Sequence, residues 1–292
     1  MMIESVINYK EHLLKKGKSE NTVYAYITDI NLYMRFLTKE KIDLFKSNKQ
    51  TILFYIQYLN NQGKSERSIS RAAVSLRKFF YYLKEEQLIK EIPTIEYKTS
   101  EQRELPEILT VEEVNIIINK VEKTGPKGIR DNAILELMYA TGIKVSELVE
   151  LDEEDINLEL KYIKCKDSKH VERIIPIGKN ACSSISDYLK IRNRLAQNEV
   201  SNLFVNLSGN KLTRQGIWRI VKEYVQISDI DKDVNLNTFR HSFAVHLLQN
   251  GADARTVQKL LGNQVMTYMD SYYEAIKSEN VDSVYMHAHP RA

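Results

Sequence analysis

Apolar residues recur every three or four positions between residues 4 and 91, which predicts amphipathic helices separated by polar turns. The first expected helix covers residues 3–14. A second follows Ser19, a residue type that suits an N-cap, along SENTVYAYITDINLYMRFL. A third covers TILFYIQYLNNQG and ends at Gly63, and a fourth covers SERSISRAAVSLRKFFYYLKEEQLI. This part of the chain is therefore expected to be a helical bundle.

The fourth helix carries two stripes at helical spacing. The apolar stripe, which predicts the buried face, consists of Ile69, Ala73, Leu76, Phe80 and Leu83. The second stripe lies on another side and consists of Arg67, Arg71, Ser75 and Lys78. Its cations are candidates for contact with a phosphate backbone. A helix face that is merely solvated explains the same spacing.

A charged, polar stretch between Pro93 and Pro106 interrupts the helical pattern and is typical of a linker. We therefore expect a helical domain over residues 1–92, a linker over 93–106, and a second domain over 107–292. A chain of 292 residues also exceeds what a single core usually covers.

The second domain mixes helices with a small sheet. Thr110 and Glu113 have capping-box spacing, and DNAILELMYATG predicts an apolar helix that stops at Gly142. KYIKC and VERIIPI are typical of two short strands joined by the polar turn KDSKH. From Ala181 to the end the pattern is helical again, and it includes DARTVQKLLG and MTYMDSYYEAI. The predicted fold is mainly α, with a small antiparallel sheet in the second domain.

Composition and charge are those of an ordinary globular protein, with 43% hydrophobic and 28% charged residues. The net charge is +3, and residues 1–98 hold 17 Lys and Arg against 11 Asp and Glu. This N-terminal surplus favours a polyanionic partner, although a solvated surface gives the same excess.

Cysteine and histidine spacing gives no sign of a disulfide framework or a zinc site. Cys165 and Cys182 are isolated thiols, and His287 and His289 lie far from both in sequence. The N-terminus lacks the apolar core of a signal peptide, and no apolar run is long enough to span a membrane. We expect a cytoplasmic protein with no membrane partner and no metal.

Three segments resemble the tyrosine recombinase (phage integrase) family, and in particular its Xer-like members. GIRDNAILELMYATGIKVSEL is similar to the first catalytic box of the family, TFRHSFAVHLLQNGADARTVQKLLG to the second, and SYYEA to the nucleophile segment. The N-terminal helices are similar to the family's core-binding domain, and the terminal HAHPRA to the ending of Xer proteins. The resemblance covers nearly the whole chain.

The resemblance implies a helical core-binding domain and a mixed α/β catalytic domain that clamp double-stranded DNA. It implies that a tyrosine attacks a phosphodiester, becomes joined to the 3′ phosphate and is displaced by a 5′ hydroxyl of another strand, with no metal or nucleotide cofactor. It also implies a dimer or tetramer on DNA, with or without a second recombinase as partner.

Two of the expected catalytic positions match the family, and three are substituted. Arg240 matches the second catalytic arginine and Tyr272 the nucleophile. Lys144 stands where the first arginine is expected, which keeps the charge but loses the planar fork. Asn237 replaces a proton-relaying histidine, and Asn263 replaces a histidine or tryptophan that donates to the phosphate. Asparagine donates hydrogen bonds but does not titrate.

The remaining position is a lysine that serves as general acid in the strand turn. Lys164, Lys166 and Lys169 are all candidates, of which we favour Lys166 and then Lys169. Substitutions at the chemical centre leave two hypotheses. The chain is either a recombinase that cleaves DNA through Tyr272, with weak activity, or an impaired homologue that serves as a DNA-binding, synapsis or regulatory module.

Overall fold

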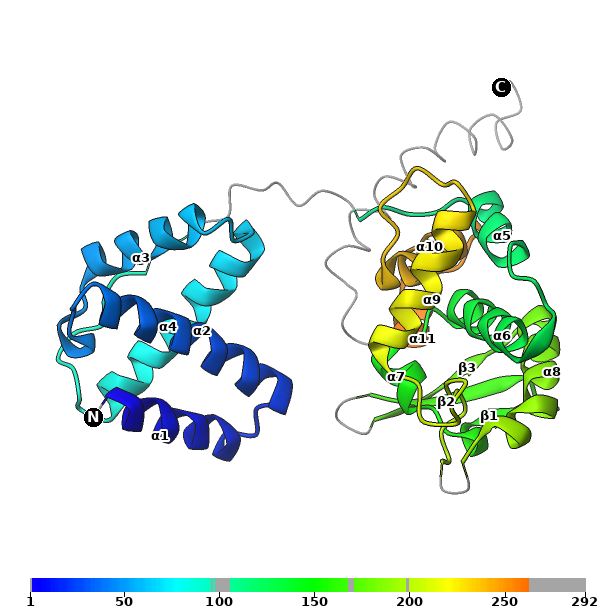
Figure 1. Ribbon diagram of the computed structural model, residues 1–292, viewed down its shortest axis with the longest axis horizontal. Coiled ribbons are helices and arrows are strands. Elements are labelled where there is room, and N and C mark those ends of the chain that lie inside the picture. Colours follow the sequence, from blue (N-terminus) through cyan, green and yellow to red (C-terminus); the bar gives the residue numbers. More distant parts are fainter. Residues whose placement is uncertain (1, 96, 98–105, 168–170, 198–199, 263–292) are drawn as a thin grey trace. The chain divides into compact units, whose positions relative to one another are not determined.

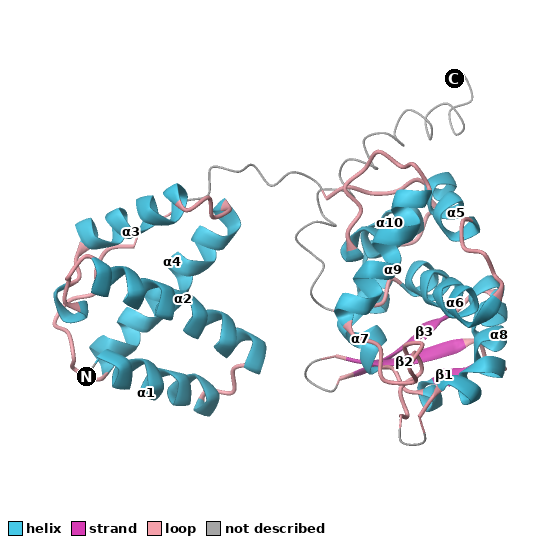
Figure 2. Cartoon of the chain, in the orientation of Figure 1, coloured by secondary structure: helices cyan, strands magenta, loops and turns pink. Residues whose placement is uncertain are grey.

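The chain forms two compact units, Met1–Glu104 and Leu105–Ala292, each with its own apolar core (Figure 1). A computed structural model describes residues 2–95, 97, 106–167, 171–197 and 200–262. The two units divide within the stretch 93–106 that the sequence assigns to a linker. The secondary structure is mainly α with a small antiparallel sheet, which confirms the predicted fold class (Figure 2).

The N-terminal unit is built from helices, and α2 packs against both α1 and α4. Its elements are α1 (Met2–Lys15), α2 (Glu20–Lys39), the 3-10 turn η1 (Leu44–Lys46), α3 (Lys49–Asn61) and α4 (Glu66–Glu85). The predicted cap at Ser19 is confirmed, because its hydroxyl accepts a hydrogen bond from the Thr22 backbone N–H at 3.3 Å. All five apolar positions predicted for the buried stripe of α4 are buried.

The prediction of the second stripe of α4 was wrong at one position, Ser75, which is fully buried. The Ser75 hydroxyl donates to Asp29 Oδ2 at 2.8 Å, and Asp29 on α2 is only 5% exposed. Arg71 donates to both oxygens of the same carboxylate, from Nε at 3.0 Å and from Nη2 at 2.8 Å. A buried carboxylate needs such partners to offset its desolvation, and here they join α2 to α4.

The C-terminal unit contains a three-stranded antiparallel sheet in the order β1-β2-β3. The elements before the sheet are α5 (Val111–Asn119), α6 (Gly125–Thr141), α7 (Val145–Glu150) and the 3-10 turn η2 (Glu153–Asp155). The strands are β1 (Ile156–Asn157), β2 (Tyr162–Lys166) and β3 (Glu172–Pro176). They are followed by α8 (Lys179–Leu195), α9 (Arg214–Ile227), α10 (Leu236–Gln249) and α11 (Ala254–Leu261).

Local sequence signals in this unit are confirmed where they rest on caps and strands. Thr110 and Glu113 form the expected capping box, and α6 ends at Gly142 in the left-handed conformation, with φ of 56°. β2 and β3 pair antiparallel, with Ile163 opposite Ile175. The helical pattern expected from Ala181 onward is present in α8, α9, α10 and α11, but it is interrupted by an irregular segment with two short bridges after α8.

Helix α10 connects the main core of the C-terminal unit to a smaller apolar cluster. Phe239 is fully buried in the main core, which includes residues of α5, α6, α8, α9 and the sheet. Phe243 lies in the smaller cluster, together with Val257 and Leu261 of α11, and Leu247 packs against it. These anchors fix the rotation of α10 and thereby the direction of every other side chain on the helix.

In the part of the chain that the structure describes, no helix is long and apolar enough to cross a membrane. Within the same residues, no group of three or more His, Cys, Asp or Glu side chains is placed to hold a metal ion.

The Asp29 junction predicts that Asp29→Asn destabilises the N-terminal unit by about 1 to 3 kcal/mol, because an amide nitrogen would face the donors of Arg71. Urea unfolding followed by far-UV circular dichroism measures this loss. Glu85→Gln is the matched control, since Glu85 forms an exposed ion pair with Lys16 and its replacement should cost less than about 0.5 kcal/mol. Equal stability of Asp29→Asn and the wild type would contradict the assigned role of the junction.

Candidate active site

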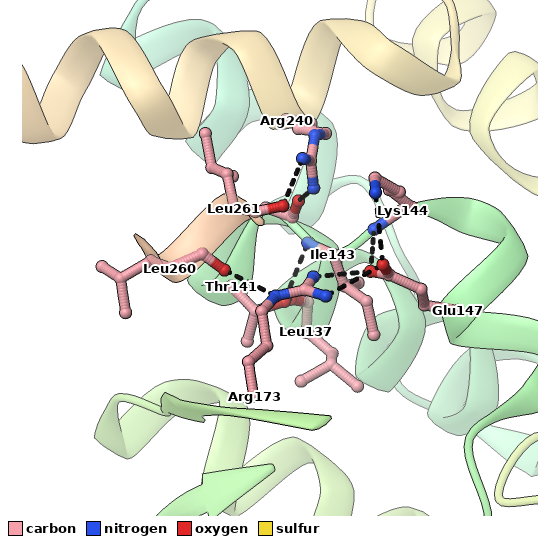
Figure 3. Close-up of polar contacts among 10 residues, drawn as sticks. Leu137, Thr141, Ile143, Lys144, Glu147, Arg173, Arg240, Leu260 and Leu261 are labelled. Atoms are coloured by element: carbon pink, nitrogen blue, oxygen red, sulfur yellow. Dashed lines mark hydrogen bonds and ion pairs between the residues drawn. The ribbon is translucent and has the colours of Figure 1, made fainter. Parts of the chain in front are cut away.

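Arg240 projects from α10 into the interior of the C-terminal unit, where it is 5% exposed. Its Nη1 donates to the Gly142 carbonyl oxygen and its Nη2 to the Leu261 carbonyl oxygen, each at 2.6 Å (Figure 3). These carbonyls lie at the C-terminal ends of α6 and α11, where a helix leaves its last carbonyls without internal partners. One guanidinium therefore joins three helices.

Burial sets the protonation of Arg240 and its neighbour. It lowers the pKa of the Arg240 guanidinium to about 10, so the group stays a cation at neutral pH. Burial, and then the charge of Arg240, lower the pKa of His241 below its ordinary value, so this imidazole is neutral at neutral pH. The site thus holds a fixed positive charge with little solvent around it.

Lys144 lies beside the same helix ends, as the N-cap residue of α7. Its ammonium is 3.6 Å from Glu147 Oε1, and its backbone N–H donates to Glu147 Oε2 at 3.1 Å. The ion pair restrains a long and flexible side chain that is 26% exposed, and the backbone hydrogen bond fixes the carboxylate that this side chain contacts. The lysine is therefore held in place by the carboxylate three positions along the chain.

Arg173, on β3, binds the same carboxylate with its planar fork. Nη1 donates to Glu147 Oε1 at 2.9 Å and Nη2 to Oε2 at 2.6 Å, while Nε donates to the Leu260 carbonyl oxygen at 2.8 Å. We call Lys144, Glu147, Arg173 and Arg240 the cationic cluster. Figure 3 shows these four side chains gathered between the start of α7 and the end of α11.

Glu147 is ionised in this setting. Burial raises the pKa of its carboxyl, but the hydrogen bonds and charge of Arg173, with the amide and charge of Lys144, outweigh burial, and the pKa lies below its ordinary value. Two cations, Lys144 and Arg173, thus contact the carboxylate, and Arg240 adds a third positive charge to the cluster, which leaves it with a positive excess. The hydrogen bonds to the two carbonyls use only some of the five N–H donors of Arg240. The cluster is therefore suited to bind an anion.

The favoured turn lysine does not join this cluster. Lys166 lies at the exposed end of β2, and its ammonium is 3.7 Å from Glu172 Oε1. Lys164 is half-buried on the same strand, opposite Ile174. Lys169 lies outside the described residues.

The other expected positions are only partly described. Asn237 is exposed in the first turn of α10, and its backbone N–H donates to Asn235 Oδ1 at 2.9 Å. Asn263 and Tyr272 both lie outside the described residues. Among the expected catalytic positions that the structure describes, Lys144 and Arg240 lie close together although they are far apart in sequence.

The basic candidates of the N-terminal unit are all exposed on α4. Arg71 keeps one side of its guanidinium on Asp29 while half of its side chain stays in solvent. The ammonium of Lys78 donates to Tyr26 Oη at 2.8 Å and lies 5.0 Å from the centre of that ring. Arg67 lies near the start of the same helix. These cations remain accessible to a polyanion.

Sequence reasoning missed Glu147 and Arg173. A signal for Arg173 was available, because alternation in VERIIPI places it on the same side of the strand as buried Ile175. A charged side chain on an inward-facing strand position requires a buried partner. The sequence does not identify that partner, because Glu147 lies on α7, 26 residues before Arg173, and only the fold brings the two together.

Comparisons with known proteins agree with this architecture. Residues 107–279 match the phage integrase family, and residues 6–87 match the phage integrase N-terminal SAM-like domain. The chain is 38% identical to the tyrosine recombinase XerD of Halalkalibacterium halodurans over 284 residues, which cover 96% of this chain and 95% of the relative. It is 36% identical to XerD of Listeria monocytogenes over 297 residues, or 100% and 99% of the two chains.

Solved structures share the fold at lower identity. The XerH site-specific recombinase bound to palindromic difH substrate has a TM-score of 0.78 at 20% identity, covering 94% of this chain and 84% of that one. A lambda integrase tetramer bound to a Holliday junction has a TM-score of 0.73 at 19% identity, covering 92% and 76%.

The close packing around Gly142 predicts that Gly142→Ala destabilises the C-terminal unit by about 2 to 4 kcal/mol. A Cβ there would lie 2.5 Å from Phe243 Cδ1 and 2.8 Å from Leu261 Cδ2, in addition to the strain of a positive φ. Urea unfolding followed by the fluorescence of Trp218, the single tryptophan, measures the loss in this unit.

Gly251→Ala provides the matched control for Gly142→Ala. Gly251 also has a positive φ, of 88°, but a Cβ there would meet nothing within 4 Å. It should therefore cost only the backbone strain, about 1 kcal/mol. An equal loss of stability in the two variants would contradict the contribution that we assign to the close packing of Gly142 against α10 and α11.

Proposed function

Because this chain belongs to the phage integrase family of tyrosine recombinases, we propose that it cuts and rejoins double-stranded DNA in site-specific recombination, with Tyr272 as nucleophile. The observation that carries the proposal is the cationic cluster, in which Lys144 and Arg240 are held at the ends of three helices beside a buried carboxylate. A phosphodiester is the anion that a member of this family would place there.

The proposed chemistry is an exchange of phosphate esters. The phenol oxygen of Tyr272 attacks phosphorus, the bond to the 5′ oxygen breaks, and the protein becomes joined to the 3′ phosphate. A 5′ hydroxyl of another strand then attacks the phosphotyrosyl bond and releases the phenol. One ester replaces another at each step, so no external energy source is required.

The cationic cluster would act on the negative charge that gathers on the phosphate oxygens during each attack. Arg240 offers donors that are fixed before the substrate arrives, which is the condition under which electrostatic stabilisation is strong. Lys144 keeps a charge but lacks the fork of an arginine. Removing one such donor outright costs about 100- to 1000-fold in rate, and the ammonium offsets part of that loss.

Roles for the remaining positions follow from their chemistry. Lys166, or Lys169 in its place, would give a proton to the leaving 5′ oxygen. Asn263 would donate a hydrogen bond to the phosphate, and Asn237 would do so from the start of α10. Neither amide can accept the phenol proton of Tyr272, so that proton would pass to water or to a group outside this set.

DNA binding is proposed to use the exposed cations of α4 as well. Arg67, Arg71 and Lys78 face solvent on one helix and suit contacts with a phosphate backbone, which makes binding salt-dependent. We propose a homo-oligomer, a dimer or tetramer, on DNA in the cytoplasm.

The proposal predicts a covalent adduct between the protein and a nicked duplex in which the cleaved fragment diffuses away. A cognate site is first selected from random duplexes, and the adduct is then counted on SDS gels. The wild type and Tyr273→Phe should both form it, whereas Tyr272→Phe should form none, because the attacking oxygen is gone. No adduct by the wild type on selected DNA would refute the proposed cleavage.

A further inference from the structure

Arg173 connects two segments that are both close to the proposed reaction. Its fork binds both oxygens of Glu147 on α7, and its Nε binds the Leu260 carbonyl oxygen at the end of α11. The side chain is only 12% exposed. Most of the side chain is therefore enclosed by protein. Its hydrogen bonds go to two segments, α7 and the C-terminal end of α11.

We propose that Arg173 is a positioning residue for strand cleavage, which sets the place of Lys144 relative to the C-terminal end of α11. This inference rests on the proposed function. Arg173 acts through other groups and does not itself grip the phosphate, because its fork is already closed on Glu147.

The first direction of control runs through Glu147 to Lys144. The carboxylate oxygens that bind Arg173 are the same ones that hold the Lys144 amide and lie near its ammonium. A buried carboxylate without its guanidinium partner would turn toward water or toward the ammonium. Lys144 would then lose its fixed position, which matters more for a flexible lysine than for a planar arginine.

The second direction of control runs through α11. Arg173 binds the Leu260 carbonyl and Arg240 binds the Leu261 carbonyl, so two guanidinium groups hold successive carbonyls at the end of one helix. Cations are favoured at this end of a helix by its dipole. Each arginine therefore fixes the helix end that the other one contacts.

Gly262, the residue that follows α11, also lies near Arg173. It has a φ of 75°, and a Cβ there would lie 3.6 Å from Arg173 Nη1 and 3.7 Å from its Cζ. The backbone thus leaves α11 directly against the guanidinium of Arg173. Arg173 therefore contacts the C-terminal end of α11 both at the Leu260 carbonyl and at Gly262.

Arg173→Lys tests the fork while keeping the charge, since one ammonium cannot reach Glu147 and Leu260 together. The cleavage rate at saturating DNA should fall about 10- to 100-fold, as expected for misplaced reacting groups. The duplex Kd should change less than about 3-fold, because the cluster keeps its charge. Glu147→Gln should slow cleavage to a similar extent, and the double variant should cleave no more slowly than the slower single variant.

Arg192→Lys is the matched control. Arg192 is also a buried arginine, bound to Glu153 and to the carbonyls of Val200, Asn202 and Leu203, but it supports the segment after α8. Its replacement removes a similar set of bonds away from the cationic cluster. At a temperature where both variants are folded, Arg192→Lys should cleave at the wild-type rate.

Hydrogen exchange supplies a readout that does not require cleavage. Arg173→Lys should speed amide exchange at Lys144 and in the last turn of α11, whereas Arg192→Lys should speed it in residues 200–203. Cleavage by Arg173→Lys at the wild-type rate, or unchanged exchange at both of its segments, would overturn the positioning role. If the wild type forms no adduct, the proposed function fails, and exchange alone decides whether Arg173 holds the two segments.

Discussion

The structure of the site depends on a buried guanidinium held by two helix ends. Arg240 takes the last free carbonyls of α6 and α11, and those carbonyls replace the water that its charge has lost. The group stays charged because its pKa, though lowered by burial to about 10, is still above neutral pH. A fixed charge of this kind exists before any substrate arrives, and it needs little reorganisation to act.

The rest of the C-terminal unit can be understood as support for that charge. Phe239 and Phe243 fix α10, and Gly142 lets α6 end close enough for its carbonyl to reach the guanidinium. Arg173 and Glu147 extend the same support to Lys144. The N-terminal unit uses the opposite arrangement, in which a buried carboxylate, Asp29, is satisfied by Arg71 and Ser75.

Features that depend on neighbouring residues could be predicted from the sequence. The caps at Ser19 and Thr110, the end of α6 at Gly142 and the β2–β3 pair all follow from local chemistry and spacing. The burial of Ser75 could not, because its partner Asp29 lies on another helix. The resemblance to the family identified Arg240 and Lys144, whereas Arg173 needed the fold to show its partners.

A structure of the chain bound to its selected duplex tests the central claim most directly. The measured quantity is the distance from the Arg240 nitrogens to the non-bridging oxygens of the phosphate nearest Tyr272. The account predicts direct hydrogen bonds, at about 2.7 to 2.9 Å, with the bonds to Gly142 and Leu261 kept. An Arg240 that is still buried and out of reach of every phosphate would contradict the account.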